Sequence, residues 1–117
     1  MHNVQNRHEH NYRFSQTDAF VPWMNAALAA NLVEIFRLHP AGDFFDAEYT
    51  AKWLSIIRQN KGIRFFGYTR SWSDPAISRV LRRLARLDNL RLWYSIDKDS
   101  GLPEHIPPGV RLASMAL

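Results

Sequence analysis

Short apolar runs alternate along this chain with stretches in which apolar side chains recur at helical spacing, and this alternation constrains the fold most. Strand-like runs occupy residues 33–38, 63–69 and 89–97, and a fourth, "VRLASMAL", occupies residues 110–117. They are rich in branched and aromatic residues, which is typical of buried strands. Strands separated by helices form a parallel sheet, because parallel neighbours need a crossover connection. The sequence therefore predicts an α/β fold.

The stretches between the strands carry the signals of helix ends. The predicted helices lie at about residues 19–30, 47–61 and 75–88. Asp18 and Asp46 stand where the first two helices need an N-cap, and Ser73 or Asp74 serves the third. Gly62 is expected to be the C-cap of the second helix. Each helix then follows or precedes a strand, as in βαβ units.

The number of strands limits how the sheet can close. About four strands cannot close a barrel, since small closed barrels take about eight. We therefore expect either a partial (β/α) barrel or an open parallel sheet, with about four strands and about three helices. Residues 1–16 are polar without a sustained period, so they are predicted to form an N-terminal arm ahead of a single α/β domain over residues 17–117.

Composition narrows the class of protein. The 117 residues are 46% hydrophobic and 22% charged, which is typical of a folded globular domain. There is no cysteine, so this chain supplies no disulfide, thiolate zinc site or cysteine-ligated iron–sulfur cluster. No apolar run reaches the length of about 20 residues that a membrane span needs, and the N-terminus lacks a signal-peptide core. We expect a cytoplasmic protein without membrane contact.

The charge is +4, carried mostly by arginine, which is compatible with an acidic partner. One face of the predicted helix at 75–88 carries Arg79, Arg82, Arg83 and Arg86. These arginines could bind the phosphates of a nucleic acid, although a surface helix must in any case be polar on its outer side. The open sheet edges could accept a second copy of the chain or a missing N-terminal or C-terminal partner segment. Nucleic acid ranks second among the partners considered.

Polar residues follow each of the first three predicted strands. They are Arg37, His39, Asp43, Tyr68, Thr69, Arg70, Ser95 and Asp97. Ligands of open parallel sheets bind outside the carboxyl ends of the strands, where such residues share one rim. The sequence therefore predicts a ligand site at this rim.

Each rim residue also has a simpler structural explanation. Gly42 permits a tight turn, Asp43 or Asp46 caps the following helix, and Asp97 begins the loop to Gly101. His39, next to Pro40, is expected to be a hydrogen-bonded turn residue rather than a catalytic base, because the sequence identifies no partner for it. Both explanations remain open at this stage.

Two weaker groups of residues complete the candidates. Tyr68 and Trp72 are expected to be half-buried anchors rather than platforms on which bases stack. His8 and His10 could bind a metal together with His2, but a polar arm offers no third fixed ligand, so we predict no metal site. The chain also lacks a P-loop, a dinucleotide glycine fingerprint, a nucleophile elbow and an HExxH motif.

Three blocks of the sequence together resemble the gene product 88 family of phage, plasmid and bacterial genomes, which is largely uncharacterised. The blocks are "RLHPAGDFFDAEYTAKW", "FFGYTRSW" and "LWYSIDKDSGLPEHIPPGVRLA". They cover most of residues 33–113 in the order expected for the family. Any one block would be weak support, and their joint occurrence is fairly specific.

That family in turn looks like a relative of the radical S-adenosylmethionine enzymes, which have a partial (β/α) barrel. Ala41-Gly42-Asp43 stands where those enzymes carry a GGE motif, and Ser95-Ile96-Asp97 matches their later "SxD" strand end. The resemblance implies that Gly42 and Asp43 face the methionyl amino group of S-adenosylmethionine. Thr69, Arg70 and Ser95 would line the same cavity.

The chain also departs from that pattern. It has none of the three cysteines that hold a [4Fe–4S] cluster, so a cluster requires cysteines from a missing segment or a partner. Ala41 replaces a glycine, and Asp43 replaces a glutamate. We therefore expect a truncated, split or degenerate member of the family, and leave open whether it is an enzyme. The predicted small polar ligand would bind at His39, Gly42, Asp43, Thr69, Arg70, Ser95 and Asp97.

Overall fold

The computed structural model describes residues 4–39 and 42–114. Its elements are α1 (Val4–Ser15), α2 (Phe20–Ala30), β1 (Ile35–Arg37), α3 (Ala47–Gln59), β2 (Arg64–Thr69), the 3-10 turn η1 (Ser71–Ser73), α4 (Pro75–Leu84), β3 (Leu90–Ile96) and β4 (Arg111–Ser114). The four strands are all parallel and lie in the order β1-β2-β3-β4. The predicted α/β fold with a parallel sheet is confirmed.

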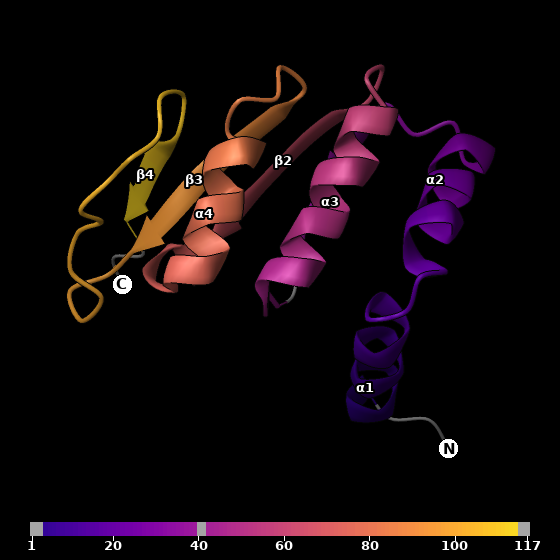
Figure 1. Ribbon diagram of the computed structural model, residues 1–117, viewed down its shortest axis with the longest axis horizontal. Coiled ribbons are helices and arrows are strands. Elements are labelled where there is room, and N and C mark those ends of the chain that lie inside the picture. Colours follow the sequence, from indigo (N-terminus) through magenta and orange to yellow (C-terminus); the bar gives the residue numbers. More distant parts are fainter. Residues whose placement is uncertain (1–3, 40–41, 115–117) are drawn as a thin grey trace.

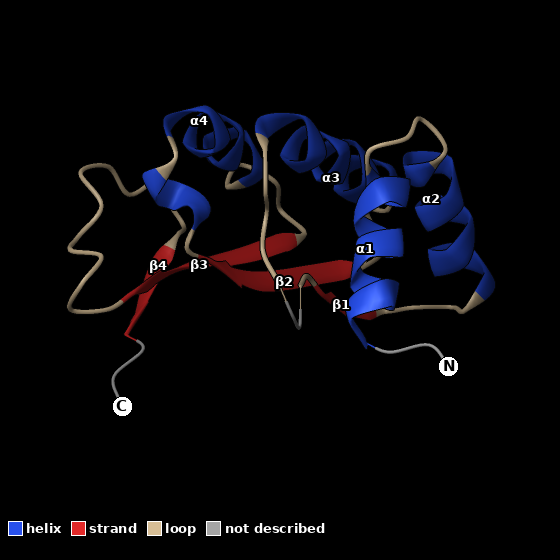
Figure 2. Cartoon of the chain, turned by 90° about the horizontal axis from the view of Figure 1, so that it is seen from below, coloured by secondary structure: helices blue, strands red, loops and turns tan. Residues whose placement is uncertain are grey.

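The sheet is open and is covered by helices on one face (Figures 1 and 2). Consecutive strands are neighbours, and right-handed crossovers repeated in one direction place the intervening helices on the same side. Figure 2 shows α3 and α4 above the sheet, and no helix of the described residues lies on the face below. β1 and β4 each pair with a single strand, so both are edges. This arrangement is an open parallel sheet and not a closed barrel.

The core fills the space between the sheet and the helices. α3 contributes Trp53, Ile56 and Ile57, and α4 contributes Leu81 and Leu84, all buried. These side chains recur at the three- and four-residue spacing of a helix face, which explains why the sequence pattern predicted both helices.

The predicted N-caps of α3 and α4 are confirmed. The Asp46 carboxylate accepts a hydrogen bond from Tyr49 N at 2.7 Å. The Asp74 carboxylate accepts bonds from Ala76 N at 2.9 Å and from Ile77 N at 3.1 Å. Each carboxylate satisfies backbone donors that the first turn of a helix otherwise leaves unpaired.

Two other predicted helix ends are wrong. Asp18 does not cap α2, because the N-cap position is Ala19 and has no side-chain hydrogen bond. Gly62 is not the C-cap of α3, which ends at Gln59 with Asn60 as its cap. The Asn60 side chain donates to Ile56 O at 2.7 Å and its backbone N–H bonds Ile57 O, so the helix is closed before the glycine is reached.

The N-terminal arm contains a helix that the sequence pattern did not predict, so the described residues hold four α-helices rather than three. Lys52 of α3 fixes the end of α1 by donating to Ser15 O at 2.9 Å and to Thr17 O at 3.1 Å. Phe14 packs edge-on against Phe20. Tertiary contacts of this kind stabilise a helix whose apolar pattern is weak. The division into an arm and a domain stays a prediction.

Element lengths differ from the predictions at several ends. β1 begins at Ile35 and not at residue 33, α4 ends at Leu84 and not at residue 88, and β4 is described only as far as Ser114. Residues 115–117 of the predicted fourth strand lie outside the described residues. Among the helices that the structure describes, none is long and apolar enough to cross a membrane.

Candidate functional site

The carboxyl ends of β1, β2 and β3 meet at one rim of the sheet because the three strands are parallel neighbours. The connection from β1 to α3 lies against the connection that follows β2. The Ser71 hydroxyl donates to Phe44 O at 2.6 Å, and this bond helps to hold the two connections together. The rim is therefore built by hydrogen bonds between segments far apart in the sequence.

Asp43 is the centre of this rim. Its Oδ1 accepts hydrogen bonds from Phe44 N at 2.7 Å and from the Thr69 hydroxyl at 2.7 Å. Its Oδ2 accepts a bond from Arg70 N at 2.8 Å. Gly42, immediately before it, has a φ of +93°, a conformation that glycine adopts without steric cost. The glycine turn thus directs the aspartate onto the end of β2.

Arg70 extends the network to the end of β3. Its guanidinium Nη1 lies 3.5 Å from Asp97 Oδ2. Asp97 Oδ1 also accepts bonds from Ser100 N at 2.7 Å and from Asp99 N at 2.9 Å. The backbone hydrogen bond from Ser100 is the main reason that the pKa of Asp97 lies below its usual value, and Arg70 adds to the effect. Asp97 therefore accepts hydrogen bonds within its own loop and forms an ion pair with Arg70 of the rim.

His39 lies beside the network on the α1 side. Its Nε2 is 2.6 Å from the Tyr49 hydroxyl, and its Nδ1 is buried without a hydrogen-bond partner. Burial lowers the pKa of His39, and the nearby Asp43 charge opposes this only partly. The ring therefore favours the neutral form, with a nitrogen whose hydrogen-bonding capacity is unused.

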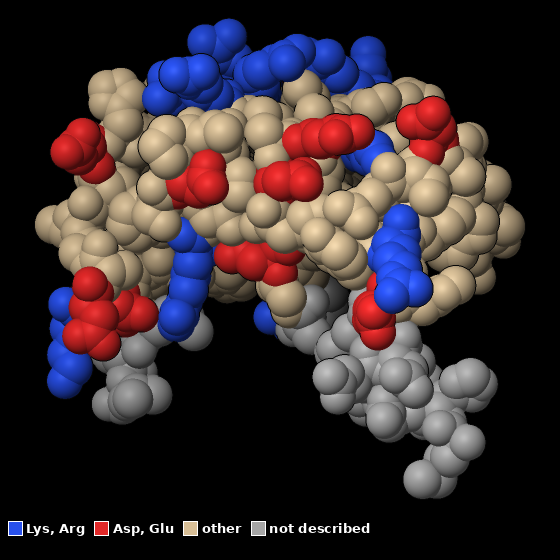
Figure 3. All heavy atoms as spheres, turned by 60° about the horizontal axis from the view of Figure 1, so that its bottom comes forward, with Lys and Arg blue, Asp and Glu red and all other residues tan. Residues whose placement is uncertain are grey.

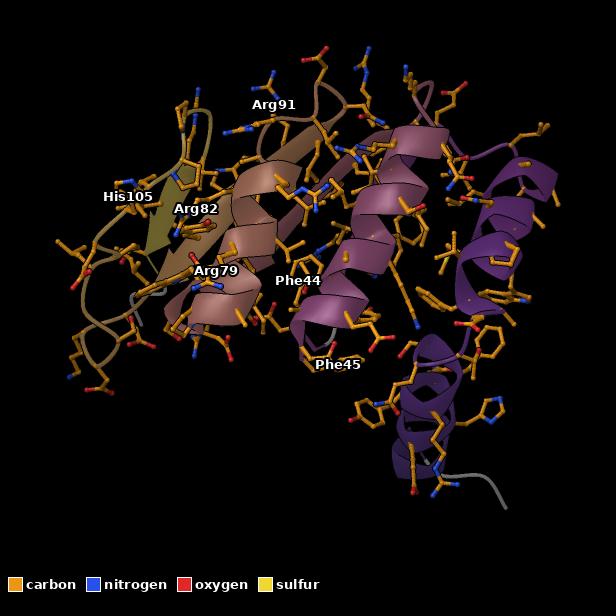
Figure 4. All side chains as sticks on the ribbon, viewed as in Figure 1. Phe44, Phe45, Arg79, Arg82, Arg91 and His105 are labelled. Carbon is orange, nitrogen blue, oxygen red and sulfur yellow. The ribbon has the colours of Figure 1, made fainter. Side chains whose placement is uncertain are left out.

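A cavity of about 270 Å³ opens between α1 and the β1–α3 connection. Its lining residues come from both segments: Asn11, Tyr12, Ser15, His39, Gly42, Asp43, Phe45 and Tyr49. Phe45 stacks on Tyr49 with ring centroids 4.2 Å apart and meets Tyr12 at 4.6 Å. Figure 4 shows Phe45 at the start of α3, on the side of α1. Among the described lining residues, the walls are largely aromatic and Asp43 is the single carboxylate.

The structure brings most of the predicted rim residues together. Asp43, Thr69, Arg70 and Asp97 form one connected network, and His39 and Gly42 adjoin it at the cavity. Ser95 is separate: by register it shares a face with Ala113 of β4, whereas Thr69 is paired with Tyr94 and faces the helices. Ala41 lies outside the described residues. That this network binds a ligand stays a prediction.

Sequence patterns missed three residues that build the cavity. No sequence motif singles out Tyr49, Phe45 or Tyr12. Tyr49 is nonetheless the partner of His39, ten positions away. A histidine in a turn and a tyrosine in the helix that follows it form no known motif, so only the folded structure identifies the pair.

Of the two predicted aromatic anchors, one is confirmed and one is wrong. Trp72 is half-buried, and its Nε1 donates to Ser95 O at 2.8 Å. Tyr68 is 42% exposed and stacks on Trp93, with ring centroids 5.0 Å apart. Tyr68 follows the strand alternation away from the helices, and no described helix covers that face.

The arginines predicted as a nucleic-acid surface lie in the helical layer. Arg79, Arg82 and Arg83 are exposed on α4, and Arg86 is exposed in the turn after it. Figure 3 shows basic side chains gathered along its upper edge, the side on which the helices lie. In Figure 4, Arg79 and Arg82 project from α4.

The iron–sulfur cluster that the radical S-adenosylmethionine resemblance implies does not fit this chain. Its ligands are thiolates, and the sequence contains no cysteine. Within residues 4–39 and 42–114, no group of three histidine, aspartate or glutamate side chains is placed to hold a metal ion. We therefore derive no chemical step through a cluster.

Comparison with known proteins identifies a protein family and finds no similar solved structure. The family model described as "Gene product 88" matches residues 1–117. The "Gene 88 protein" of Mycobacterium phage L5 is 40% identical over 67 residues, which are 57% of this chain and 26% of that protein. The "Gene 88 protein" of Mycobacterium phage D29 is 36% identical over 67 residues, with the same coverage. The matched segment thus spans about a quarter of each relative. No solved structure matches.

Proposed function

This chain belongs to the gene product 88 family, and from the geometry of its rim we propose that it binds a small organic cation in the cavity between α1 and the β1–α3 connection. The observation that carries the proposal is the combination of one carboxylate, Asp43, with aromatic walls in a cavity of about 270 Å³. An ammonium or sulfonium group is the chemistry that such a lining recognises.

The aromatic walls favour a cation over a neutral ligand. Tyr12, Phe45 and Tyr49 form a continuous row with centroid separations of 4.6 Å and 4.2 Å. The faces of aromatic rings carry negative electrostatic potential, and they attract a cation within about 6 Å of the ring centre. Among the residues whose side chains the structure describes, no lysine or arginine lines this cavity.

Asp43 has capacity left for a ligand. A carboxylate offers about four acceptor sites. Two bonds to Oδ1 and one to Oδ2 come from the protein, so one site on Oδ2 remains. The three internal bonds fix the carboxylate in place, which reduces the entropy that a bound ammonium group would cost.

The cavity size selects a small ligand. Ligand pockets typically measure about 300–1,000 Å³, so about 270 Å³ lies just below that range. The methionyl end of S-adenosylmethionine carries an ammonium group, a sulfonium group and one carboxylate, so it is cationic overall. The resemblance to radical S-adenosylmethionine enzymes led to this ligand, and we propose binding alone, without a radical reaction.

Isothermal titration calorimetry tests this proposal. The ligands are S-adenosylmethionine, methionine and the α-hydroxy analogue of methionine, which has no amino group. We expect binding of the first two and none of the third. The variant Tyr12→Leu removes one aromatic wall and should weaken binding. Trp23→Leu changes an aromatic side chain that is 54% exposed and does not line the cavity, so it serves as the matched control.

Two results would contradict the proposal. The first is the absence of heat and of any thermal shift with every cationic ligand. The second is equal weakening by Tyr12→Leu and Trp23→Leu, which would show that binding does not involve the cavity. Circular dichroism of both variants establishes that they are folded before titration.

The arginine surface of α4 supports a second candidate function, binding of nucleic acid. The specific observation is that Pro75–Leu84 contains no acidic residue, while Arg79, Arg82 and Arg83 are exposed. Among the described residues, none of the three forms an ion pair with a carboxylate. Replacing these arginines and Arg86 by alanine should weaken binding and reduce its dependence on salt. Salt-insensitive binding, or none, would remove this candidate.

A further inference from the structure

The sheet face opposite the helices carries a second concentration of arginine that the functions above do not use. The register of the strands identifies the residues whose side chains alternate onto this face: Ile35, Arg37, Arg64, Phe66, Tyr68, Arg91, Trp93, Ser95, Arg111 and Ala113. We call this set the open face. In Figure 2 it is the underside of the sheet, away from α3 and α4. Each strand contributes an arginine to it.

The open face is strongly basic. Arg37, Arg64, Arg91 and Arg111 are all exposed, and no residue of the set is acidic. Within the part of the chain that the structure describes, none of these four guanidinium groups forms an ion pair. A surface of this charge attracts a polyanion, and it repels a second copy of itself because like charges would meet.

Aromatic side chains lie among these arginines. Tyr68 and Trp93 are register partners on neighbouring strands, and their rings stack 5.0 Å apart with an interplanar angle of 19°. Tyr68 is 42% exposed, and Phe66 and Trp93 are half-buried. An exposed aromatic cluster surrounded by cations is unusual for a free surface and is suited to stacking against flat rings.

A cavity of about 300 Å³ lies along β3 and β4, lined by Arg91, Trp93 and Arg111 of the open face together with Leu92 and Gly109. Trp93 is the register partner of Arg111, and Arg91 lies two positions before it on the same face. Both arginines are therefore neighbours of Trp93 on this face of the sheet. Phosphate groups beside the arginines and a base against Trp93 would suit this part of the cavity.

We propose that the open face binds single-stranded nucleic acid, with phosphates at the four arginines and bases on Tyr68 and Trp93. Charge complementarity selects a polyanion, and the aromatic residues select one with exposed flat bases. A duplex hides its bases in the stack, so it can use only the arginines. This surface lies on the opposite layer from the arginines of α4, which allows the two to be tested separately.

Fluorescence anisotropy with a labelled oligonucleotide of about twelve nucleotides tests the proposal, since single-strand-binding domains cover about 4–16 nucleotides. The probes are oligo-dT, oligo-U and a duplex of the same length. We expect a single strand to bind more tightly than the duplex. The tighter of the two single-stranded probes assigns the ligand to DNA or to RNA.

Two double variants with equal changes in charge separate the surfaces. Arg64→Glu with Arg91→Glu alters the open face, and Arg79→Glu with Arg83→Glu alters α4. The first pair should reduce affinity more than about tenfold and lower the slope of log affinity against log salt by about 1.4, or about 0.7 for each lost phosphate contact. The second pair should have a much smaller effect on affinity.

The aromatic contribution needs its own variants. Tyr68→Ala and Trp93→Ala should each weaken single-strand binding by about fivefold or more with an unchanged salt slope, because stacking and not charge is lost. Since Trp93→Ala could also disturb the sheet, Tyr68→Ala, at an exposed residue, is the deciding variant. Circular dichroism verifies the fold of each.

Several results would overturn the proposal. They are the absence of single-strand binding, equal loss of affinity in the two charge-reversal pairs, tighter binding of the duplex, and unchanged affinity in Tyr68→Ala. Equal loss would indicate only an effect of net charge, and a selective loss in the α4 pair would assign binding to that helix. All of these outcomes leave ligand binding at Asp43 unaffected, because that cavity lies at a different part of the fold.

Discussion

At the scale of single residues, Asp43 stands out because its carboxylate accepts three hydrogen bonds from the protein. Its carboxylate joins the end of β1 to Thr69 and Arg70 at the end of β2. The sequence predicted that the acid after Gly42 would either cap the following helix, a role that Asp46 takes instead, or face a ligand. It could not predict these partners, because they lie 26 and 27 positions away and are brought together only by the parallel pairing of β1 with β2.

Asp43→Asn should lower the free energy of unfolding. An amide that keeps Oδ1 toward Phe44 and Thr69 presents its NH2 group to the Arg70 N–H, so this exposed hydrogen bond is lost at a cost of about 0.5–1.5 kcal/mol. Urea denaturation measures the change. Asp99→Asn, at an exposed residue, is the control and should have little effect. Equal stability of the two variants would show that the Asp43 bonds contribute nothing.

His39 should make stability depend on pH. Burial holds its folded-state pKa below the ordinary value of 6.5, so between the two values the unfolded chain binds more protons than the folded one. This contribution to stability is fully present above pH 6.5 and is lost as the pH falls toward the lower, folded-state value.

The variant His39→Asn isolates this effect. His39 has a φ of +49°, in a region that asparagine also tolerates, so the substitution removes the titrating group without forcing a new backbone conformation. The melting temperature of the natural chain should fall more steeply than that of the variant as the pH drops below 6.5. Parallel pH profiles from circular dichroism would contradict the assignment.

At the scale of elements, the sequence predicted the helix N-caps that are formed by aspartate side chains. It did not predict the helix end that is formed by an asparagine. Asp46 and Asp74 act through neighbours two or three positions away, so the sequence displays the whole interaction. The end of α3 depends instead on Asn60. Its side chain donates a hydrogen bond to Ile56 O. Gly62, the residue that a helix-end pattern favours, is not the C-cap.

β2 contains a glycine whose importance the strand pattern did not reveal. Gly67 lies on the helix-facing side, where an added Cβ would stand 3.0 Å from Leu38 Cβ. Gly67→Ala should therefore destabilise the protein by about 1–3 kcal/mol through overpacking. Gly62→Ala is the matched control, because nothing lies within 4 Å of its added Cβ. Urea denaturation that ranks Gly62→Ala as the more damaging change would contradict this packing.

At the scale of the whole molecule, alternation of strands and helices was enough to predict an α/β fold with a parallel sheet. It could not show whether helices would cover one face or two, since that depends on the order of the strands in space. The order β1-β2-β3-β4 leaves the open face uncovered by the described helices, and it also aligns the three strand ends that form the rim. α1, which completes the cavity, had no clear apolar pattern and was missed.

The central claim is that the cavity at Asp43 binds a small organic cation. A titration of the ¹⁵N-labelled protein with S-adenosylmethionine, followed by NMR, tests it most directly because each amide reports its own surroundings. We expect saturable shifts at the amides of Phe45, Tyr49 and Arg70, around the cavity, and no shifts at the amides of Arg64 and Arg91 on the open face. Saturation without shifts at the cavity, or no shifts at any ligand concentration, would contradict it.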